Sequence, residues 1–575
     1  MKNNFLFYEN LIKGIDFCLN GHSFSKHQNF WDLIVITSIN QKQRKCYELQ
    51  LEIKKNQGKI PKSFKFLVID DPNGCKIGSG GSTLNVVKEL FQLYSQKLYD
   101  MKILLIHAGG YSQRIPFRSI LGKLFGLLPS ESEYINDIFD FKLACFTPFA
   151  KDMDPGIFIT SSDDIETFIL EEQIEASKLF SVFDQDFILL AHKSSLNTAK
   201  DHGVYKIDFN VDSCENEPNF GCFSCQSVYQ KPSIEKIRNL KMAFNDGISE
   251  YAFTDSVFFF SHKVSRELLE FHDQHFKKII QLKIEIDIYR DFLQPLGDNK
   301  QELDQYLSTI KINNGQELDV FTKIYELMNE KPAKILFFKE SKFFHLGTID
   351  EMMEYYFDCT SKDAINFREE ICFKKNIAEI KKRYLVRSKI GPKCVLNENV
   401  IIELSYFDES VEIVIGKNSL ISNCMFKLND FTGETKNIKI SVPSDIYLHT
   451  VPIIDGVSDK RKFVTIFFKR NDDLKKTYAS FESLKILGKN LGKIASHVLC
   501  SGEYSIWNFK FFKSFDTMSD SFLHSCNFIN DYLDSNFENI HIYFQDDKKK
   551  FISLFDLLEQ NDFEYMLQFR LDIGL

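Results

Sequence analysis

The sequence predicts an α/β protein in which a mostly parallel sheet is followed by a domain of short, stacked β-strands. Apolar runs alternate with a helical pattern in the first third of the chain, which is typical of parallel strands joined by helices. Beyond about residue 380 the apolar runs become short and β-branched, with polar turns between them. The chain has 575 residues, which is enough for about two to four domains.

The predicted strands of the first domain are runs of buried-type residues, at 31–37, 64–69, 103–106, 156–160, 187–191 and 257–260. One apolar helix face is predicted from three- and four-residue spacing by Leu84, Val87, Leu90, Phe91, Tyr94 and Leu98. Residues 335–338 and 343–346 predict a hairpin. Ligands of parallel sheets bind beyond the carboxyl ends of the strands, so we expect the chemistry in those loops.

The second domain is predicted from short steps at 390–391, 400–402, 413–416 and 420–421. Stacked parallel strands of small period are typical of a β-helix. We therefore expect an α/β domain over residues 1–380 and a β-helix-like domain over residues 381–575, with a helical tail from about residue 550.

Charge and composition exclude several classes of protein. With 71 Lys and Arg against 80 Asp and Glu, the formal net charge is −9, so the chain lacks the cationic surface of a sequence-independent nucleic-acid binder. A hydrophobic content of 44% excludes a mainly disordered chain. No apolar run approaches the roughly 18 residues of a spanning helix. We expect no nucleic acid and no membrane as partner. The sequence gives no indication of whether the protein is a monomer or an oligomer.

The N-terminus and the cysteines indicate a cytoplasmic protein. The sequence MKNNFLFYEN has no long apolar core followed by a cleavage site. The 13 Cys form no framework, and their odd count does not suit complete pairing. Cys222 and Cys225 form one CxxC, which without a second ligand pair is better explained as two ordinary thiols than as a zinc site.

The most informative segment is 106–116, Ile-His-Ala-Gly-Gly-Tyr-Ser-Gln-Arg-Ile-Pro, which is followed by Gly122 and Lys123. A strand that ends in Gly-Gly lets the backbone approach a ligand closely, with N–H groups that can face phosphate oxygens. Arg114 adds a planar bidentate partner for phosphate, and Lys123 adds a compact charge. The alternative to a phosphate-binding loop is an ordinary tight turn that carries a surface Arg. The positions of both Arg114 and Lys123 after an apolar strand make this alternative less favoured.

This segment resembles the signature of the sugar-1-phosphate nucleotidylyltransferases, in which a strand precedes Gly-Gly-x-x-x-Arg-x-x-Pro and then Lys. More narrowly, it is similar to the form found in the fucose-1-phosphate guanylyltransferases, or GDP-L-fucose pyrophosphorylases. Further segments resemble motifs of the same family and occur in the same order along the chain. They lie at 78–85, 201–205, 230–233, 254–256, 285–287, 291–294, 344–348, 472–475 and 506–508. The resemblance runs from about residue 64 to 510.

The resemblance implies a Rossmann-like nucleotidyltransferase domain and transfer of a guanylyl group from GTP to L-fucose 1-phosphate. The products would be GDP-L-fucose and pyrophosphate, as in the salvage of free fucose. Another sugar 1-phosphate, another nucleotide, or a non-catalytic regulatory paralogue that binds sugar nucleotides are the alternatives. A fused fucokinase is not expected, because no second kinase motif accompanies the glycine-rich loop and several hundred more residues would be needed.

The resemblance also implies roles for individual residues. Arg114 matches the Arg that neutralises the β- and γ-phosphates, and Lys123 matches the Lys that reaches the reacting phosphates. Lys231 resembles the Lys of a Glu-Lys-Pro element that contacts the sugar phosphate, although Gln230 replaces the Glu. The expected nucleotide-binding residues are Gly80, Gly81, Ser82, Thr83, His107, Ala108, Gly109, Gly110 and Ser112.

The resemblance also implies which residues bind the sugar and the metal ion. Gly203 and Val204 match the step that lines the sugar pocket, and Thr254 and Asp255 are candidates for hydrogen bonds to sugar hydroxyls. Mg²⁺ takes one or two carboxylates plus substrate phosphates. The expected ligands are Asp164, or Asp163 where the family usually has Gly, and Asp287, with Glu285 or Asp291 as alternatives.

Overall fold

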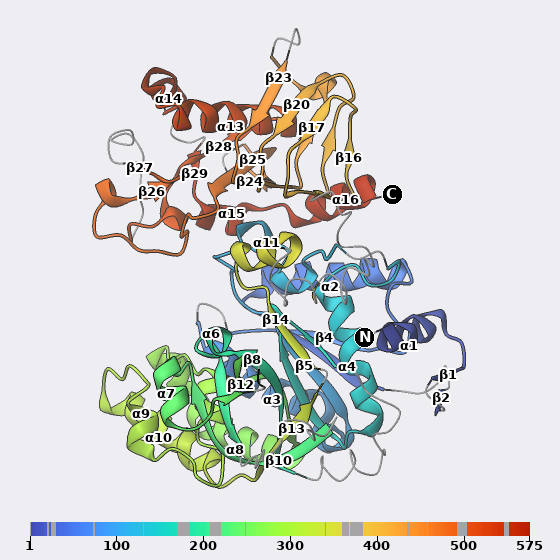
Figure 1. Ribbon diagram of the computed structural model, residues 1–575, viewed down its shortest axis with the longest axis vertical. Coiled ribbons are helices and arrows are strands. Elements are labelled where there is room, and N and C mark those ends of the chain that lie inside the picture. Colours follow the sequence, from blue (N-terminus) through green and yellow to red (C-terminus); the bar gives the residue numbers. More distant parts are fainter. Residues whose placement is uncertain are drawn as a thin grey trace. The chain divides into compact units, whose positions relative to one another are not determined.

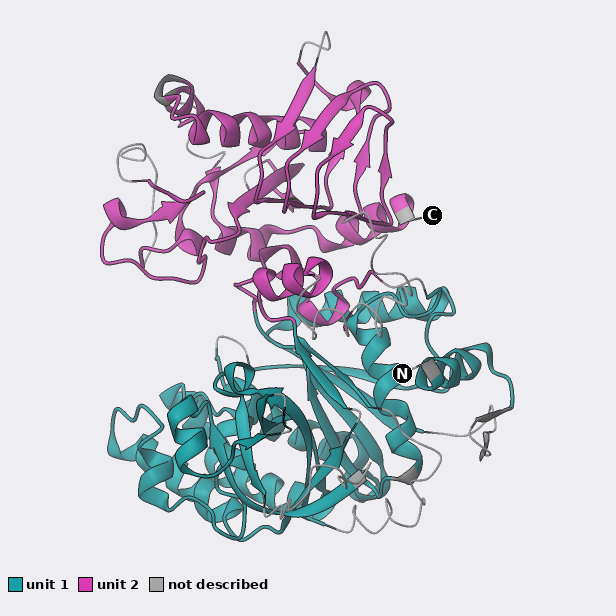
Figure 2. Ribbon diagram, viewed as in Figure 1, with its two compact units in different colours: residues 1–110, 132–345 teal, residues 111–131, 346–575 magenta. Residues whose placement is uncertain are grey.

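The structure is a computed structural model. It describes residues 2–19, 22–24, 30–72, 75–129, 132–168, 185–207, 220–245, 247, 249–339, 341–358, 367, 383–433, 438–456, 458–491, 503–544 and 551–574. Two compact units divide the chain: unit 1 comprises residues 1–110 and 132–345, and unit 2 comprises residues 111–131 and 346–575 (Figure 2). The boundary predicted near residue 380 falls on 368–382, outside the described residues.

The first half of the unit 1 sheet is parallel, as predicted. Its strands lie in the order β4-β3-β5-β6, and all three neighbouring pairs are parallel. Figure 1 labels β4 and β5 of this group. Each predicted apolar run forms one strand: β3 (Leu33–Ser38), β4 (Phe66–Asp70), β5 (Lys102–His107) and β6 (Gly156–Ser161). Their carboxyl ends therefore lie at one edge of the sheet.

The second half of the sheet is mixed, which corrects the expectation of a mostly parallel sheet. The order continues β12-β8-β13-β10-β9, and only β8 and β13 pair in parallel. Their bounds are β12 (Glu250–Ser261), β8 (Phe187–Ser195), β13 (Ala333–Phe338), β10 (Phe220–Gln230) and β9 (Gly203–Ile207). The long antiparallel strand β12 joins the two halves.

The predicted hairpin is wrong. β13 pairs with β8 and β10, whereas β14 (Lys342–His345) pairs antiparallel with β7 (Asp164–Thr167). The apolar pattern identified both strands correctly but could not indicate their partners. The pairing brings His345 opposite Asp164, one of the predicted metal ligands.

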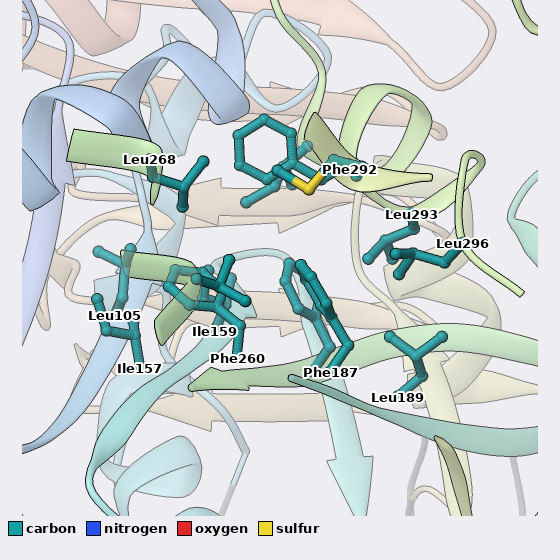
Figure 3. Close-up of a cluster of buried hydrophobic side chains, with 14 of the residues drawn as sticks. Leu105, Ile157, Ile159, Phe187, Leu189, Phe260, Leu268, Phe292, Leu293 and Leu296 are labelled. Carbon is teal, nitrogen blue, oxygen red and sulfur yellow. The ribbon is translucent and has the colours of Figure 1, made fainter. Parts of the chain in front are cut away.

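One face of the sheet is buried under helices α3 (Gly78–Tyr94) and α8 (His262–Leu282). Leu105 of β5 and Ile157 of β6 lie in one cluster of buried side chains with Leu268 of α8 and Phe292 (Figure 3). Leu84, Val87 and Leu90 of α3 belong to the same cluster, which confirms the predicted helix face. The hydrophobic burial of this face fixes where the strand ends lie.

Helix α4 (Ile138–Asp152) covers the opposite face. Phe146 and Phe149 of this helix contact Phe158 of β6, with ring centroids 5.5 and 5.7 Å apart. Both faces of the sheet are therefore covered, as expected for an α/β fold. Among the described helices, none has the length and apolarity that crossing a membrane requires.

Unit 2 contains three parallel sheets built by successive short strands. Consecutive strands along the chain enter the first, second and third sheet in turn, and this order repeats. The first sheet holds β15 (Arg383–Val386), β18 (Val400–Glu403), β21 (Leu420–Ser422) and β24 (Ile446–Ile454). The second holds β16 (Lys389–Ile390), β19 (Tyr406–Phe407) and β22 (Met425–Phe426); the third holds β17 (Cys394–Leu396), β20 (Glu412–Ile415) and β23 (Lys439–Val442).

The first of these sheets continues with antiparallel strands. β24 pairs with β25 (Arg461–Lys469), which pairs with β28 (Phe512–Phe515). Helix α13 (Met518–Leu533) follows, and the chain ends in helices α15 (Leu554–Gln560) and α16 (Phe563–Gly574).

Candidate active site

The turn after β5 is held by the neighbouring strand β3. The N–H groups of Ala108 and Gly109 both donate to Thr37 Oγ1, at 3.1 and 3.3 Å. The carbonyl of Gly110 accepts from Gln43 Nε2 at 3.0 Å, and Gly110 has a φ of +130°, which favours glycine. Thr37, which the sequence did not indicate, therefore takes the N–H of Gly109, one of the groups expected to face a nucleotide.

His107 ends β5 in a defined tautomer. The Thr83 hydroxyl donates to the Ser79 carbonyl at 3.0 Å, so its oxygen accepts from Nε2–H of His107 at 2.9 Å. Burial lowers the pKa of His107 to about 4, and the ring is neutral near pH 7. Its Nδ1 is buried and has no partner among the described residues. This nitrogen is an unused acceptor beside the Gly-Gly turn.

The glycine-rich segment 78–83 opens helix α3 and packs against unit 1 itself. Gly80 N–H donates to the Ile286 carbonyl at 2.8 Å, and a side chain at Gly80 would overlap Ile286. Ser82 donates to Asp71 Oδ1 at 2.6 Å, and burial raises the pKa of Asp71 to about 7. The glycines thus permit close packing, and the expected nucleotide role of Gly80, Gly81, Ser82 and Thr83 stays a prediction. Asp71 is a further polar group that we did not single out.

The cationic part of the signature belongs to unit 2. The carbonyl of Ser112, which has a φ of +48°, accepts from the Ile115 N–H at 2.8 Å, and this turn encloses Arg114. The Arg114 side chain is exposed and pairs with none of the described residues. Lys123 is half-buried at the start of the helical turn η3 (Lys123–Phe125). Arg114 is therefore available to an anionic ligand.

Asp164 forms a buried ion cluster with Lys142 and Glu166. Lys142 of α4 places its Nζ 2.6 Å from Asp164 Oδ1 and 3.2 Å from Glu166 Oε2, and it donates to Thr160 Oγ1 at 2.9 Å. Burial raises the pKa of Glu166 to about 8. Lys142 and Glu166 were missed, although a lone Lys inside an apolar helical pattern is a signal of a buried charge partner.

Asp163 and Asp287 are more accessible than Asp164. Asp163 is half-buried, accepts from Ser161 Oγ at 3.1 Å, and has its Oδ2 3.9 Å from His345 Nε2. Asp287 is exposed and uses Oδ1 to accept from the Arg290 N–H at 2.9 Å, which caps the helical turn η5 (Ile288–Leu293). Both carboxylates can take a further ligand.

The two alternatives to Asp287 are already paired. Asp291 is fully buried, where it accepts from Arg290 Nε at 2.7 Å and from the Tyr306 hydroxyl at 3.0 Å. Glu285 pairs with Lys76 at 2.9 Å on the surface. Asp287 is therefore the member of this set that best fits a metal ligand.

The predicted sugar residues meet in one hydrogen-bonded network. Asp255 of β12 accepts from the Gly203 N–H and from Gln230 Nε2, both at 2.8 Å. Gln230 also donates to the Tyr289 carbonyl at 3.2 Å. A Glu at position 230 would place two carboxylates together, which the amide of Gln230 avoids. A side chain at Gly203 would overlap Asp255.

The remaining sugar-side residues are placed differently. Val204 is buried opposite Tyr229 in the β9–β10 ladder. Thr254 is fully buried, with its Oγ1 2.7 Å from Ser194 Oγ. Lys231 is exposed, and its N–H donates to the His202 carbonyl at 3.0 Å. Of these three side chains, Lys231 has the exposure that contact with a sugar phosphate requires.

The carboxylates of unit 1 influence one another. Burial raises the pKa of Asp255 to about 6, and the negative charges of Asp287 and Asp164 act in the same direction. No group of three or more His, Cys, Asp or Glu side chains is arranged to hold a metal in the described part of the chain.

The two thiols of the CxxC pair do not point to one common site. Cys222 is exposed and Cys225 is buried, because residues three apart on the strand β10 point to opposite faces. Cys214 lies outside the described residues.

The chain is similar in sequence to known proteins over most of its length. The fucose pyrophosphorylase domain matches residues 95–520. A fucose-1-phosphate guanylyltransferase of Homo sapiens is 29% identical over 95% of this chain and 91% of its own length. The protein of the same name from Mus musculus is 31% identical over 80% of this chain and 77% of its own. A bifunctional fucokinase/GDP-fucose pyrophosphorylase of Arabidopsis thaliana is 28% identical over 38% of this chain and 22% of its own length.

Proposed function

The chain belongs to the fucose pyrophosphorylase family, and from this premise we propose that it transfers a guanylyl group from GTP to L-fucose 1-phosphate. The products are GDP-L-fucose and pyrophosphate, and the reaction serves the salvage of free fucose. The observation that carries the proposal is similarity to two fucose-1-phosphate guanylyltransferases over 95% and 80% of the chain.

The reaction needs positioning and charge more than proton transfer. A phosphate oxygen of L-fucose 1-phosphate attacks the α-phosphorus of GTP, and the bond from that phosphorus to the β-bridging oxygen breaks. The attacking oxygen is already ionised near pH 7, so no general base is required. Two polyanions must instead be held in line while their repulsion is offset.

Cationic side chains supply that offset in our proposal. Arg114 neutralises the β- and γ-phosphates of the leaving pyrophosphate, and Lys123 reaches the reacting phosphates. The exposure of Arg114 supports this role, because a guanidinium with no partner among the described residues can bind phosphate in a bidentate manner. Lys231 holds the sugar phosphate.

The nucleotide and sugar are assigned to the strand ends of unit 1. The Gly110 turn and His107 Nδ1 face the nucleotide, and Gly203 with the Asp255–Gln230 pair faces the fucose ring. Support comes from the unused acceptor on His107 and from the network that already orders Asp255.

Asp163 and Asp287, with Asp164 as the third candidate, would hold Mg²⁺. They fit the ion because their accessible carboxylate oxygens are hard ligands, whereas Lys142 already neutralises Asp164. When bound, the ion supplies positive charge against the phosphates.

Three further points belong to the proposal. The repeating parallel sheets of residues 383–442 form the coils of a β-helix, as their regular alternation among three ladders supports. The protein works in the cytoplasm, where the free thiols of the described cysteines stay reduced. No nucleic acid or membrane takes part.

Pyrophosphate release by the purified chain with Mg²⁺ and L-fucose 1-phosphate tests the proposal, with GTP, UTP and ATP compared side by side. We expect turnover with GTP to exceed the other two by at least tenfold. Equal rates would replace guanylyl transfer by a less selective activity. Tight binding of GDP-L-fucose without any turnover would instead identify a regulatory paralogue.

A further inference from the structure

We propose that unit 2 acts as the holder of the signature loop, and that Trp507 is the positioning residue for Arg114. This inference rests on the proposed function, because it concerns the phosphate-binding role of Arg114. It gives a function to the C-terminal part of the chain and to the segment 506–508, neither of which the reaction chemistry explains.

The central observation is a hydrogen bond between residues that are 394 positions apart. Trp507 lies in the helical turn η9 (Ile506–Asn508) and is 3% exposed. Its Nε1–H donates to the carbonyl of Gln113 at 3.3 Å. That carbonyl and the N–H of Arg114 belong to the same peptide group. The indole therefore restrains the peptide plane that directs Arg114.

Other contacts within unit 2 hold the same loop on both sides of Arg114. The rings of Tyr111 and Phe555 meet edge to face at 6.5 Å, and the ring of Phe117 lies 6.4 Å from that of His449, on β24. Every one of these partners lies in the C-terminal part of the chain. The loop is thus tied by long-range contacts rather than by a strand or a long helix.

The far end of the loop is tied in the same way. The Tyr356 hydroxyl, on α11 (Ile349–Phe357), donates to the Leu127 carbonyl at 3.4 Å. Arg118 is buried and donates to the same carbonyl at 3.4 Å and to Met352 Sδ at 3.6 Å. The segment that carries Lys123 is therefore held from α11.

Precise restraint matters because Arg114 itself has no partner among the described residues that could orient it. Electrostatic stabilisation of phosphate depends on donors that are placed before the substrate arrives. The Arg114 side chain is long, so a small rotation of the Gln113–Arg114 peptide group displaces the guanidinium by a larger distance than it displaces the peptide itself. Loss of the indole N–H should therefore lower turnover in a protein that is still folded.

Trp507→Phe tests the proposal, because it keeps an aromatic ring and removes the N–H donor. The chain offers a matched control, since its other Trp, Trp31, is also fully buried but its Nε1 has no partner among the described residues. We expect kcat/KM for the nucleotide to fall about threefold to tenfold in Trp507→Phe, as loss of one hydrogen bond implies. Trp31→Phe should stay within about twofold of wild type.

A double-variant cycle separates positioning from general damage. In the Arg114→Ala background, Trp507→Phe should lower turnover no further, and KM for the sugar phosphate should not change in either background. An equal fall in both backgrounds, or a fall no larger than that of Trp31→Phe, would overturn the positioning role. If Trp507→Phe fails to fold, Tyr356→Phe replaces it. Loss of that hydroxyl should lower kcat/KM about twofold or more in a folded protein, and wild-type kinetics would overturn the holder role.

The test is independent of which substrates the enzyme accepts. Each variant is compared with wild type on the nucleotide and sugar phosphate that wild type turns over best. If the proposed function is wrong, the wild-type protein will not prefer GTP with L-fucose 1-phosphate. If this inference is wrong, the kcat/KM of Trp507→Phe relative to wild type will not fall as expected.

Discussion

Two buried carboxylates of unit 1 and one arginine of unit 2 are presented in opposite ways. In unit 1, Asp164 is buried against Lys142, and Asp255 is buried against the Gly203 N–H and Gln230. In unit 2, Arg114 is exposed and unpaired among the described residues, while the backbone beside it is held by Trp507. Asp164 and Asp255 are thus engaged with other groups of unit 1 before any substrate arrives, whereas the guanidinium of Arg114 is available to a ligand.

This difference separates stability from turnover. Changing a paired buried charge in unit 1 should unfold the protein more easily, because its partner is left buried and uncompensated. Changing Arg114 should leave the fold intact and remove phosphate binding. Each of the following variants tests one side of that contrast.

The largest effect is expected from Lys142→Met. It leaves Asp164 and Glu166 buried without their cation, which should lower the free energy of unfolding by about 3–5 kcal/mol. Urea unfolding followed by circular dichroism measures this change. The double variant Lys142→Met with Glu166→Gln removes one of the two buried carboxyl groups that lost their partner and should recover part of the loss. Unchanged stability in the single variant would contradict a structural role for the cluster.

Arg114→Ala should show the opposite behaviour. We expect turnover to fall about 10²- to 10³-fold, as for removal of one strong donor to developing charge, with no change in the unfolding midpoint. Arg387→Ala is the matched control, because Arg387 is also exposed in unit 2 but lies outside the signature. Near-normal pyrophosphate release by Arg114→Ala would remove the catalytic role of this residue.

Asp255→Asn tests the buried carboxylate through pH. Its pKa is raised from 3.8 to about 6, chiefly by burial, so the folded state binds this proton more tightly than the unfolded state does. The wild-type group therefore favours folding at low pH, and this contribution is lost as pH rises from about 4 to about 6. At about 1.4 kcal/mol per pKa unit, the loss is about 3 kcal/mol.

The variant cannot titrate at this position. Its unfolding free energy relative to wild type should thus increase by about 3 kcal/mol between pH 4 and pH 7, and stay level above that. Denaturant unfolding at several pH values measures the difference. A difference that does not change with pH would show that Asp255 is not perturbed as described.

Gln230→Glu should have the smallest effect of the set. It places a second carboxylate beside Asp255, and we expect a loss of about 1–3 kcal/mol in unfolding free energy at pH 8. The loss should shrink at pH 6, where the pair takes up a proton. Gln230→Met removes the amide donors without adding charge and should show no such pH dependence. Identical behaviour of the two variants would exclude the charge explanation for Gln at this position.

The local features of unit 1 could be predicted from the sequence. The runs at 103–106 and 156–160 are apolar, and a segment with helical spacing lies between them. A few consecutive residues are therefore enough to predict that each run is a strand. The Gly-Gly turn and Arg114 could be found for the same reason. Strand partners could not, because pairing of β14 with β7 joins segments that share no local pattern.

The contacts that complete the site were not predictable. The bond from Trp507 to Gln113 spans 394 residues, and neither side has a sequence signal of the other. Asp164 was predicted as a metal ligand because it follows a strand. The sequence did not show that Lys142, from the preceding helix α4, forms an ion pair with this carboxylate. Side chains that meet only in three dimensions decide which charges are free, and this information appears first in the folded chain.

A crystal structure with a GTP analogue that carries a non-cleavable α–β bridge would test the central claim most directly. We predict that β- or γ-phosphate oxygens lie within about 3.2 Å of the Arg114 guanidinium, with the Trp507–Gln113 hydrogen bond intact. A triphosphate bound away from Arg114 would contradict the account.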